Sequence, residues 1–247
     1  FTGVNQTNGY WTTAIRLSEC PQSNLVNLQV DGSRGGDENG HFTLIGIEFH
    51  SVNSATQYTV VGLQIIWCDR GIVARGGKAG AQVGVIEGIH MTNCNFVACN
   101  RGIDTTELFA ENGRAPNGLL ILNSHFACTN YCFVGPAEQS LFQSNLFYSR
   151  PGATAADRLV FIFDSNTASN FNIISNCIFV NVGDAGGNTP VGGITLGTNT
   201  DFVMIRDNIF QMSNTPNSAI EFQDGMKNNV QGDNMFAGNV NPVVVGP

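Results

Sequence analysis

The chain repeats a short pattern of polar and apolar positions along most of its length. A polar residue, two spacers and a phenylalanine recur six times, ending at Phe96, Phe126, Phe147, Phe179, Phe210 and Phe236. The polar residues of these copies are Asn93, Asn123, Ser144, Asn176, Asp207 and Asp233. Five residues before the phenylalanine, five of the six copies have a large apolar residue, as at Met91 and Ile174. A pattern that keeps its core while its spacing varies indicates a structural repeat with loop insertions.

A second pattern lies between the copies of the first. An Asn or Asp and two spacers precede a β-branched or aromatic residue, at Ile72, Ile103, Phe133, Val160, Ile220 and Val244. Ile194 keeps the step but lacks the polar residue. Two short strands per repeat, joined at Gly and Asn corners, predict an all-β parallel solenoid whose coils stack on one another. From the repeat steps we expect about nine coils.

The repeat runs through most of the 247 residues, so we expect one elongated domain. Residues 24–247 are predicted to form the solenoid, and residues 1–23 an N-terminal cap or connecting segment, because solenoid ends need atypical capping segments. Where the step between copies is long, we expect projecting loops, such as residues 106–117.

The composition of the chain excludes several classes of binding partner. Charged residues make up 12% of the chain and hydrophobic residues 42%, which excludes the low hydrophobicity and high charge of disordered chains. The net charge of −8 and the absence of a basic run argue against a nucleic-acid partner and an anionic membrane surface. No apolar run approaches the length needed to span a membrane. Carbohydrate remains compatible with this charge.

The repeated polar and sulfur-containing residues suit the inside of a stack. Asn and Asp side chains at one repeat position are predicted to hydrogen-bond along the stack, and the phenylalanine column to stack internally. Cys94 and Cys177 share a repeat position with Ser124, and none of the seven cysteines forms a CxxC pair. We interpret the cysteines as buried free thiols. The histidines show no metal spacing, and we predict neither a metal site nor a cofactor.

Irregular coils, Asn-rich corners, an aromatic stack and scattered Cys and Ser columns resemble the right-handed parallel β-helices of the pectate-lyase-like superfamily. Long variable loops make the chain most similar to bacteriophage tailspike depolymerase domains. The resemblance covers about residues 24–247 and implies a single-stranded right-handed parallel β-helix. Asn199, Thr200 and Asp201 match one polygalacturonase motif, but the family's other three motifs are missing.

Carboxylates that recur at fixed repeat positions are the candidates for chemistry. One residue after the second pattern's apolar residue, side chains should face outward, and Asp104, Phe161 and Glu221 stand there. Three residues further on, Glu107, Asp164 and Asp224 form an acidic column at a corner. Neighbours in this column are two coils apart, about 10 Å, which is near the separation of the two carboxylates in an inverting glycosidase. Asp104 and Glu221 are four coils apart, about 19 Å, which is too far for them to act as one pair.

These positions give each residue a predicted role. Asp164 is the expected base or nucleophile, with Glu107 or Asp224 as the acid. Phe161 and Phe163 are expected to stack on sugar, and Asp104 and Glu221 to contact substrate. The alternative is that these acids close turns at strand ends.

The resemblance implies a phage tailspike-like receptor-binding domain that binds and cleaves bacterial capsule or lipopolysaccharide glycan by glycoside hydrolysis. A polysaccharide lyase, a non-catalytic glycan-binding module, and a structural β-helix of a fibre or adhesin are the alternatives. It further implies a location in a virion tail or outside the cell, and a homotrimer. The outward residues Phe161, Phe163 and Val134 could form the trimer interface instead of contacting sugar.

Overall fold

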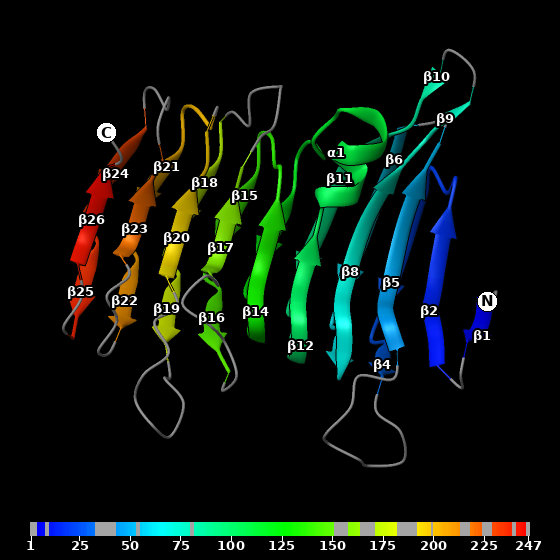
Figure 1. Cartoon of the computed structure of the whole chain (residues 1–247), viewed down its shortest axis with the longest axis horizontal. Helices are drawn as coiled ribbons and strands as arrows, with labels where there is room; N and C mark the ends of the chain where they lie inside the picture. Colours follow the sequence, from blue (N-terminus) through cyan, green and yellow to red (C-terminus); the bar gives the residue numbers. More distant parts are fainter. Residues whose placement is uncertain are drawn as a thin grey trace.

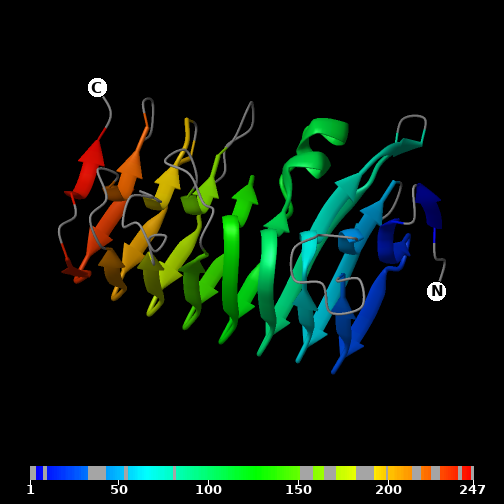
Figure 2. The same cartoon turned by 60° about the horizontal axis from the view of Figure 1, so that its bottom comes forward.

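The computed structural model shows an all-β protein in which parallel strands stack along one long axis (Figure 1). It describes residues 4–7, 10–32, 43–52, 55–79, 82–150, 158–163, 171–181, 192–198, 200–212, 218–223, 229–238 and 241–245. The N-terminal and C-terminal strands lie at opposite ends of the stack (Figures 1 and 2). Parallel strands of successive coils stack on one another in the way expected of a right-handed parallel β-helix, so the predicted fold class is confirmed.

One sheet takes a single strand from each coil, and we call it the minor sheet. Its strands, in chain order, are β3 (Gln22–Val26), β6 (Ala55–Val61), β11 (Val85–Thr92), β13 (Leu120–Leu122), β15 (Leu141–Gln143), β18 (Ile173–Ser175), β21 (Met204–Arg206) and β24 (Val230–Gly232). The described residues therefore contain eight coils with a strand in this sheet. The expected nine coils were too many.

The other large sheet, which we call the major sheet, has sixteen strands in the described residues. They are β1 (Val4–Thr7), β2 (Tyr10–Ser18), β4 (Gln29–Asp31), β5 (Thr43–Ser51), β7 (Gln64–Ile66), β8 (Cys68–Gly76), β12 (Asn95–Asp104), β14 (His125–Gly135), β16 (Leu146–Ser149), β17 (Arg158–Ile162), β19 (Ile178–Asn181), β20 (Gly192–Leu196), β22 (Ile209–Met212), β23 (Ser218–Phe222), β25 (Met235–Ala237) and β26 (Asn241–Val245). A typical coil thus has three strand segments where the sequence predicted two. The long strands β12 and β14 each join, within one coil, the two segments that a neighbouring coil divides between β7 and β8 or between β16 and β17.

Two insertions interrupt the stack. Strands β9 (Lys78–Ala79) and β10 (Gln82–Val83) form a small antiparallel hairpin. Helix α1 (Thr106–Asn112) packs against β8, so the loop predicted over residues 106–117 is partly helical (Figure 1). Across the described ranges, no helix is long and apolar enough to cross a membrane.

The N-terminal strands join the solenoid directly. Strand β2 pairs in parallel with β5, and β1 pairs antiparallel with β2. The predicted boundary between residues 23 and 24 falls within β3, which pairs in parallel with β6.

The register of the coils follows the sequence repeat. The apolar residues five before each phenylalanine align across the minor sheet, from Met91 through Ile121 to Ile174 and beyond. In the major sheet, Ile72, Ile103 and Phe133 align as expected. The last copy of the second pattern was misplaced by one residue, because Val243 rather than Val244 pairs with Ile220.

The predicted phenylalanine column is confirmed as an internal stack. Phe96, Phe126, Phe147, Phe179 and Phe210 are fully buried, and Phe236 packs at the end. Ring centroids of successive members lie 4.7, 5.2, 5.0, 4.7 and 5.3 Å apart. These spacings match the distance between neighbouring strands, so each coil contributes one ring.

The polar residues of the first pattern have another role than the one predicted. Asn93, Asn123, Ser144, Asn176, Asp207 and Asp233 all have positive φ, between 46° and 58°. Asn and Asp tolerate this left-handed conformation better than most residues, so these positions form the corner itself. The hydrogen-bonded ladder stands one residue later. There the Asn208 side chain accepts from the Cys177 amide (2.9 Å) and donates to the Ile174 carbonyl (3.0 Å).

All seven cysteines are free, and all except the half-buried Cys20 are buried. This confirms the interpretation as buried thiols. Burial raises the pKa of the Cys99 thiol to about 12 and that of Cys177 to about 11. These side chains therefore stay protonated at neutral pH and act as small apolar residues of the core.

Candidate functional site

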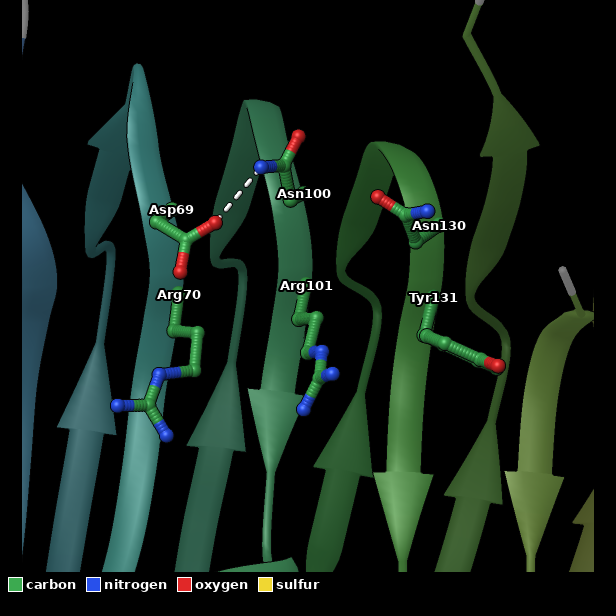
Figure 3. Close-up of a pocket in the computed structure, with 6 residues that line it drawn as sticks. All are labelled: Asp69, Arg70, Asn100, Arg101, Asn130 and Tyr131. Carbon is green, nitrogen blue, oxygen red and sulfur yellow. Dashed lines mark hydrogen bonds between the residues drawn. The ribbon is translucent and has the colours of Figure 1, made fainter. Parts of the chain in front are cut away.

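A polar groove crosses three coils on the outer face of the major sheet (Figure 3). Its volume is about 350 Å³, and six half-buried residues line it: Asp69, Arg70, Asn100, Arg101, Asn130 and Tyr131. They come in three consecutive pairs, one pair from each of strands β8, β12 and β14. The repeat therefore builds the groove, because each coil places two neighbouring polar residues at the same height.

The first row of the groove, which we call the amide row, consists of Asp69, Asn100 and Asn130 (Figure 3). The Asn100 amide donates to the Asp69 carboxylate at 2.6 Å. These are the polar residues of the second sequence pattern, so the predicted bonding between coils holds for this pair. The row presents carboxylate and amide oxygens together with amide N–H groups.

The second row, which we call the guanidinium row, consists of Arg70, Arg101 and Tyr131. The three residues pair directly across the parallel strands. The Arg101 guanidinium carbon lies 5.9 Å from the centre of the Tyr131 ring, within the range of a cation–π contact. The row thus offers two cations and one aromatic face.

Asp104 forms ion pairs with both arginines of the guanidinium row. It was predicted to face outward and contact substrate. Its register position is as expected, but its side chain is 0% exposed. Arg101 pairs with it at 2.7 Å and Arg70 at 3.8 Å. The Asp104 carboxylate also accepts from the amide (3.0 Å) and hydroxyl (2.5 Å) of Thr106. The long side chains of Arg101, from the same strand, and of Arg70, from the preceding coil, cover this position, so Asp104 orients the two arginines from beneath them.

Glu107 is the second carboxylate of this cluster. It lies in the first turn of α1, outside the aligned strands, and it bonds to Arg70 and Arg75. Burial alone would raise the pKa of Glu107, but the hydrogen bonds and charges of the two arginines outweigh it and lower the pKa. A general acid needs a raised pKa, so these surroundings favour an ion-pairing role over the predicted proton-donor role.

The ion pairs of Glu107 predict a stability that depends on pH. Because its pKa is lower folded than unfolded, the stabilisation is complete above the ordinary Glu value of about 4.3. It is lost as the pH falls through the folded pKa. Glu107→Gln should therefore lower the free energy of unfolding by about 1–3 kcal/mol at pH 7, and the difference from wild type should shrink in acid. Urea unfolding at a series of pH values measures this, and a difference independent of pH would contradict it.

The predicted aromatic residues continue the groove. Tyr131 and Phe161 pack with ring centroids 6.4 Å apart, and Phe161 and Phe163 with 4.8 Å. Both phenylalanines are half-buried, so part of each ring faces solvent. Val134 was expected to face outward at an interface, but it is buried.

Glu221 lies further along the same face. It pairs with Arg158 at 3.3 Å and accepts from the Thr195 hydroxyl at 3.1 Å. Arg158 reaches it by passing over Gly192, where an added Cβ would lie 2.4 Å from the arginine Cδ. Thr195 is aligned between Phe161 and Glu221, so Glu221 lies two coils beyond Phe161 and four coils beyond Asp104, apart from the groove.

The structure brings only part of the predicted site together. Asp104 and Glu107 share Arg70, and Phe161 contacts Tyr131. Asp164 and Asp224 lie outside the described residues, so their pairing with Glu107 stays a prediction. The groove residues Arg70, Arg101 and Tyr131 were not predicted, although they share one repeat position, two residues before the apolar residue of the second pattern. Arg158 occupies that position in the next coil, and this recurrence was the signal available in the sequence.

Searches against protein-family models, curated proteins and solved structures found no match to the chain.

Proposed function

We propose that the protein is a glycan-binding β-solenoid, and that the groove formed by the amide and guanidinium rows is its binding site. The observation that supports this most is the continuity of the polar groove with the rings of Tyr131, Phe161 and Phe163. Glycan sites combine aromatic faces, which pack on the apolar side of a sugar ring, with fixed polar groups that bind its hydroxyls.

Each part of the groove has a function in this proposal. The Tyr131 ring receives the apolar face of one sugar, and Phe161 extends the aromatic surface to the next coil. Asn100 and Asn130 donate to and accept from hydroxyl groups, while Asp69 accepts from them. The strands hold all of these groups in register, so little order must be gained on binding.

Replacing Tyr131 by alanine should weaken glycan binding at least about tenfold, which corresponds to about 1.4 kcal/mol. Tyr131→Phe keeps the ring and should retain most of the affinity. Phe171→Ala, on an exposed ring remote from the groove residues, is the matched control. Binding to an array of purified bacterial capsular polysaccharides and lipopolysaccharides measures all three. Equal binding by wild type and Tyr131→Ala would refute the proposed site.

The tailspike-like role extends this proposal. In it the domain serves a virion tail or another extracellular assembly as a homotrimer, and recognises bacterial surface polysaccharide. Cleavage by Asp164, with Glu107 or Asp224 as the acid, remains a prediction. Reducing-sugar release, or absorbance of an unsaturated product, separates hydrolase, lyase and binding module on any glycan that binds. Loss of that activity in Asp164→Asn would support the predicted catalytic residue.

A further inference from the structure

Arginine side chains gather around the guanidinium row in one ion-pair cluster. Four arginines, Arg16, Arg70, Arg75 and Arg101, are connected through three carboxylates, and this count covers the part of the chain that the structure describes. The carboxylates are Glu48, Asp104 and Glu107. The cluster therefore gathers four cations on one face of a protein whose net charge is −8.

Arg101 is the most exposed arginine of this cluster. Its side chain is 40% exposed, whereas that of Arg70 is 20% exposed. Nη1 of Arg101 donates to Asp104, which fixes the guanidinium beside the Tyr131 ring. A guanidinium has five N–H donors in a planar fork, a geometry that matches the two oxygens of a carboxylate.

Asp69, at the other side of the groove, sets the orientation of an acidic ligand. Its carboxylate would repel a second carboxylate in the amide row but would accept hydrogen bonds from hydroxyl groups there. In the guanidinium row, the carboxylate of the ligand would instead meet the Arg101 guanidinium. A sugar that carries one acidic substituent and several hydroxyls therefore fits with its acid toward Arg101 and its hydroxyls toward Asp69 and Asn100.

From this arrangement we propose that the groove selects acidic glycans, with the carboxylate of a uronic-acid-type sugar bound by Arg101 and its ring packed on Tyr131. The inference rests on the proposed glycan-binding function and specifies its ligand class. Arg101 would bind the carboxylate through two parallel N–H donors of its planar guanidinium. Lysine cannot replace it in this role, even though lysine keeps the positive charge next to Asp104.

The test uses the intact protein and an array of purified bacterial polysaccharides in three sets. The first set carries uronic acids, the second holds the same polysaccharides after chemical reduction of their carboxyl groups, and the third is neutral. Wild type should bind the first set and lose at least about tenfold in affinity for its reduced counterparts. Arg101→Lys should lose about as much on the first set. Arg206→Lys, on an exposed arginine of the minor sheet, should match wild type.

The outcomes separate the two proposals. Binding that survives carboxyl reduction, or equal binding by Arg101→Lys and wild type, would overturn the acidic-ligand inference and leave glycan binding intact if Tyr131→Ala still weakens it. Binding that is insensitive to Tyr131→Ala, or no binding to any set, would overturn both. Circular dichroism of Arg101→Lys establishes that a loss of binding does not come from a loss of fold.

Discussion

Replacing Phe179 by alanine is expected to lower the free energy of unfolding by about 3–5 kcal/mol. The ring is fully buried in the middle of the phenylalanine column, with its centroid 5.0 Å from that of Phe147 and 4.7 Å from that of Phe210. The substitution removes apolar burial, leaves a cavity and interrupts both stacked pairs. Urea unfolding followed by circular dichroism measures the effect.

Phe171→Ala is the matched control for this prediction. Its ring also stacks on a phenylalanine of the next coil, Phe202, with centroids 5.1 Å apart, but Phe171 is 58% exposed. Loss of an exposed stacked pair should cost about 0.5–1.5 kcal/mol at most. If the two variants were equally destabilised, stacking alone rather than burial would account for the column, contrary to our interpretation of the core.

Replacing Asp104 by asparagine is expected to cost about 3 kcal/mol, the lower end of the range for breaking a buried ion pair. The isosteric change removes the charge that both Arg70 and Arg101 face, and it leaves the two guanidiniums without their shared anion. The lower end applies because both arginines keep partial contact with water. We also expect weaker glycan binding, because Asp104 holds Arg101 beside Tyr131.

Asp207→Asn provides the comparison at an exposed pair. Asp207 faces Arg206 at 3.8 Å, and both side chains are largely exposed, so the change should cost less than about 1 kcal/mol. Asparagine also tolerates the positive φ of this corner, which keeps the backbone unstrained. Equal urea midpoints for Asp104→Asn and wild type would contradict the view that Asp104 is the buried anchor of the guanidinium row.

The solenoid could be predicted because each coil repeats the same few positions with the same requirements. The Phe96-to-Phe236 column and the apolar residues five positions earlier each occupy one site per coil, so their recurrence fixes both the fold and most of the register. The number of coils and the third strand segment of each coil were harder to predict from the sequence. Short strands such as β13 and β15 have only three residues, too few to give a pattern of their own.

The site could be predicted only in part. A repeat position indicates which face of the sheet a side chain points to, but it does not show which neighbouring side chains cover it. Asp104 does point to the outer face, but Arg101, three residues earlier in its strand, and Arg70 of the preceding coil lie over it. Glu107 lies in the first turn of a helix that begins at Thr106, and the repeat pattern did not predict this helix. Arg70 and Arg101 share a repeat position, and Asp104 follows Arg101 by three residues, but the contacts among the three side chains become apparent only once neighbouring coils are aligned.

The central claim is that glycan binds on the outer face of the major sheet at Tyr131. Hydroxyl-radical footprinting of the intact protein, with and without a polysaccharide that it captures from the array, tests this most directly. We expect Tyr131 and Phe161 to be protected from oxidation by the glycan, and the exposed rings of Phe171 and Phe202 to react as before. Protection of Phe171 and Phe202 with unchanged oxidation of Tyr131 and Phe161 would contradict it.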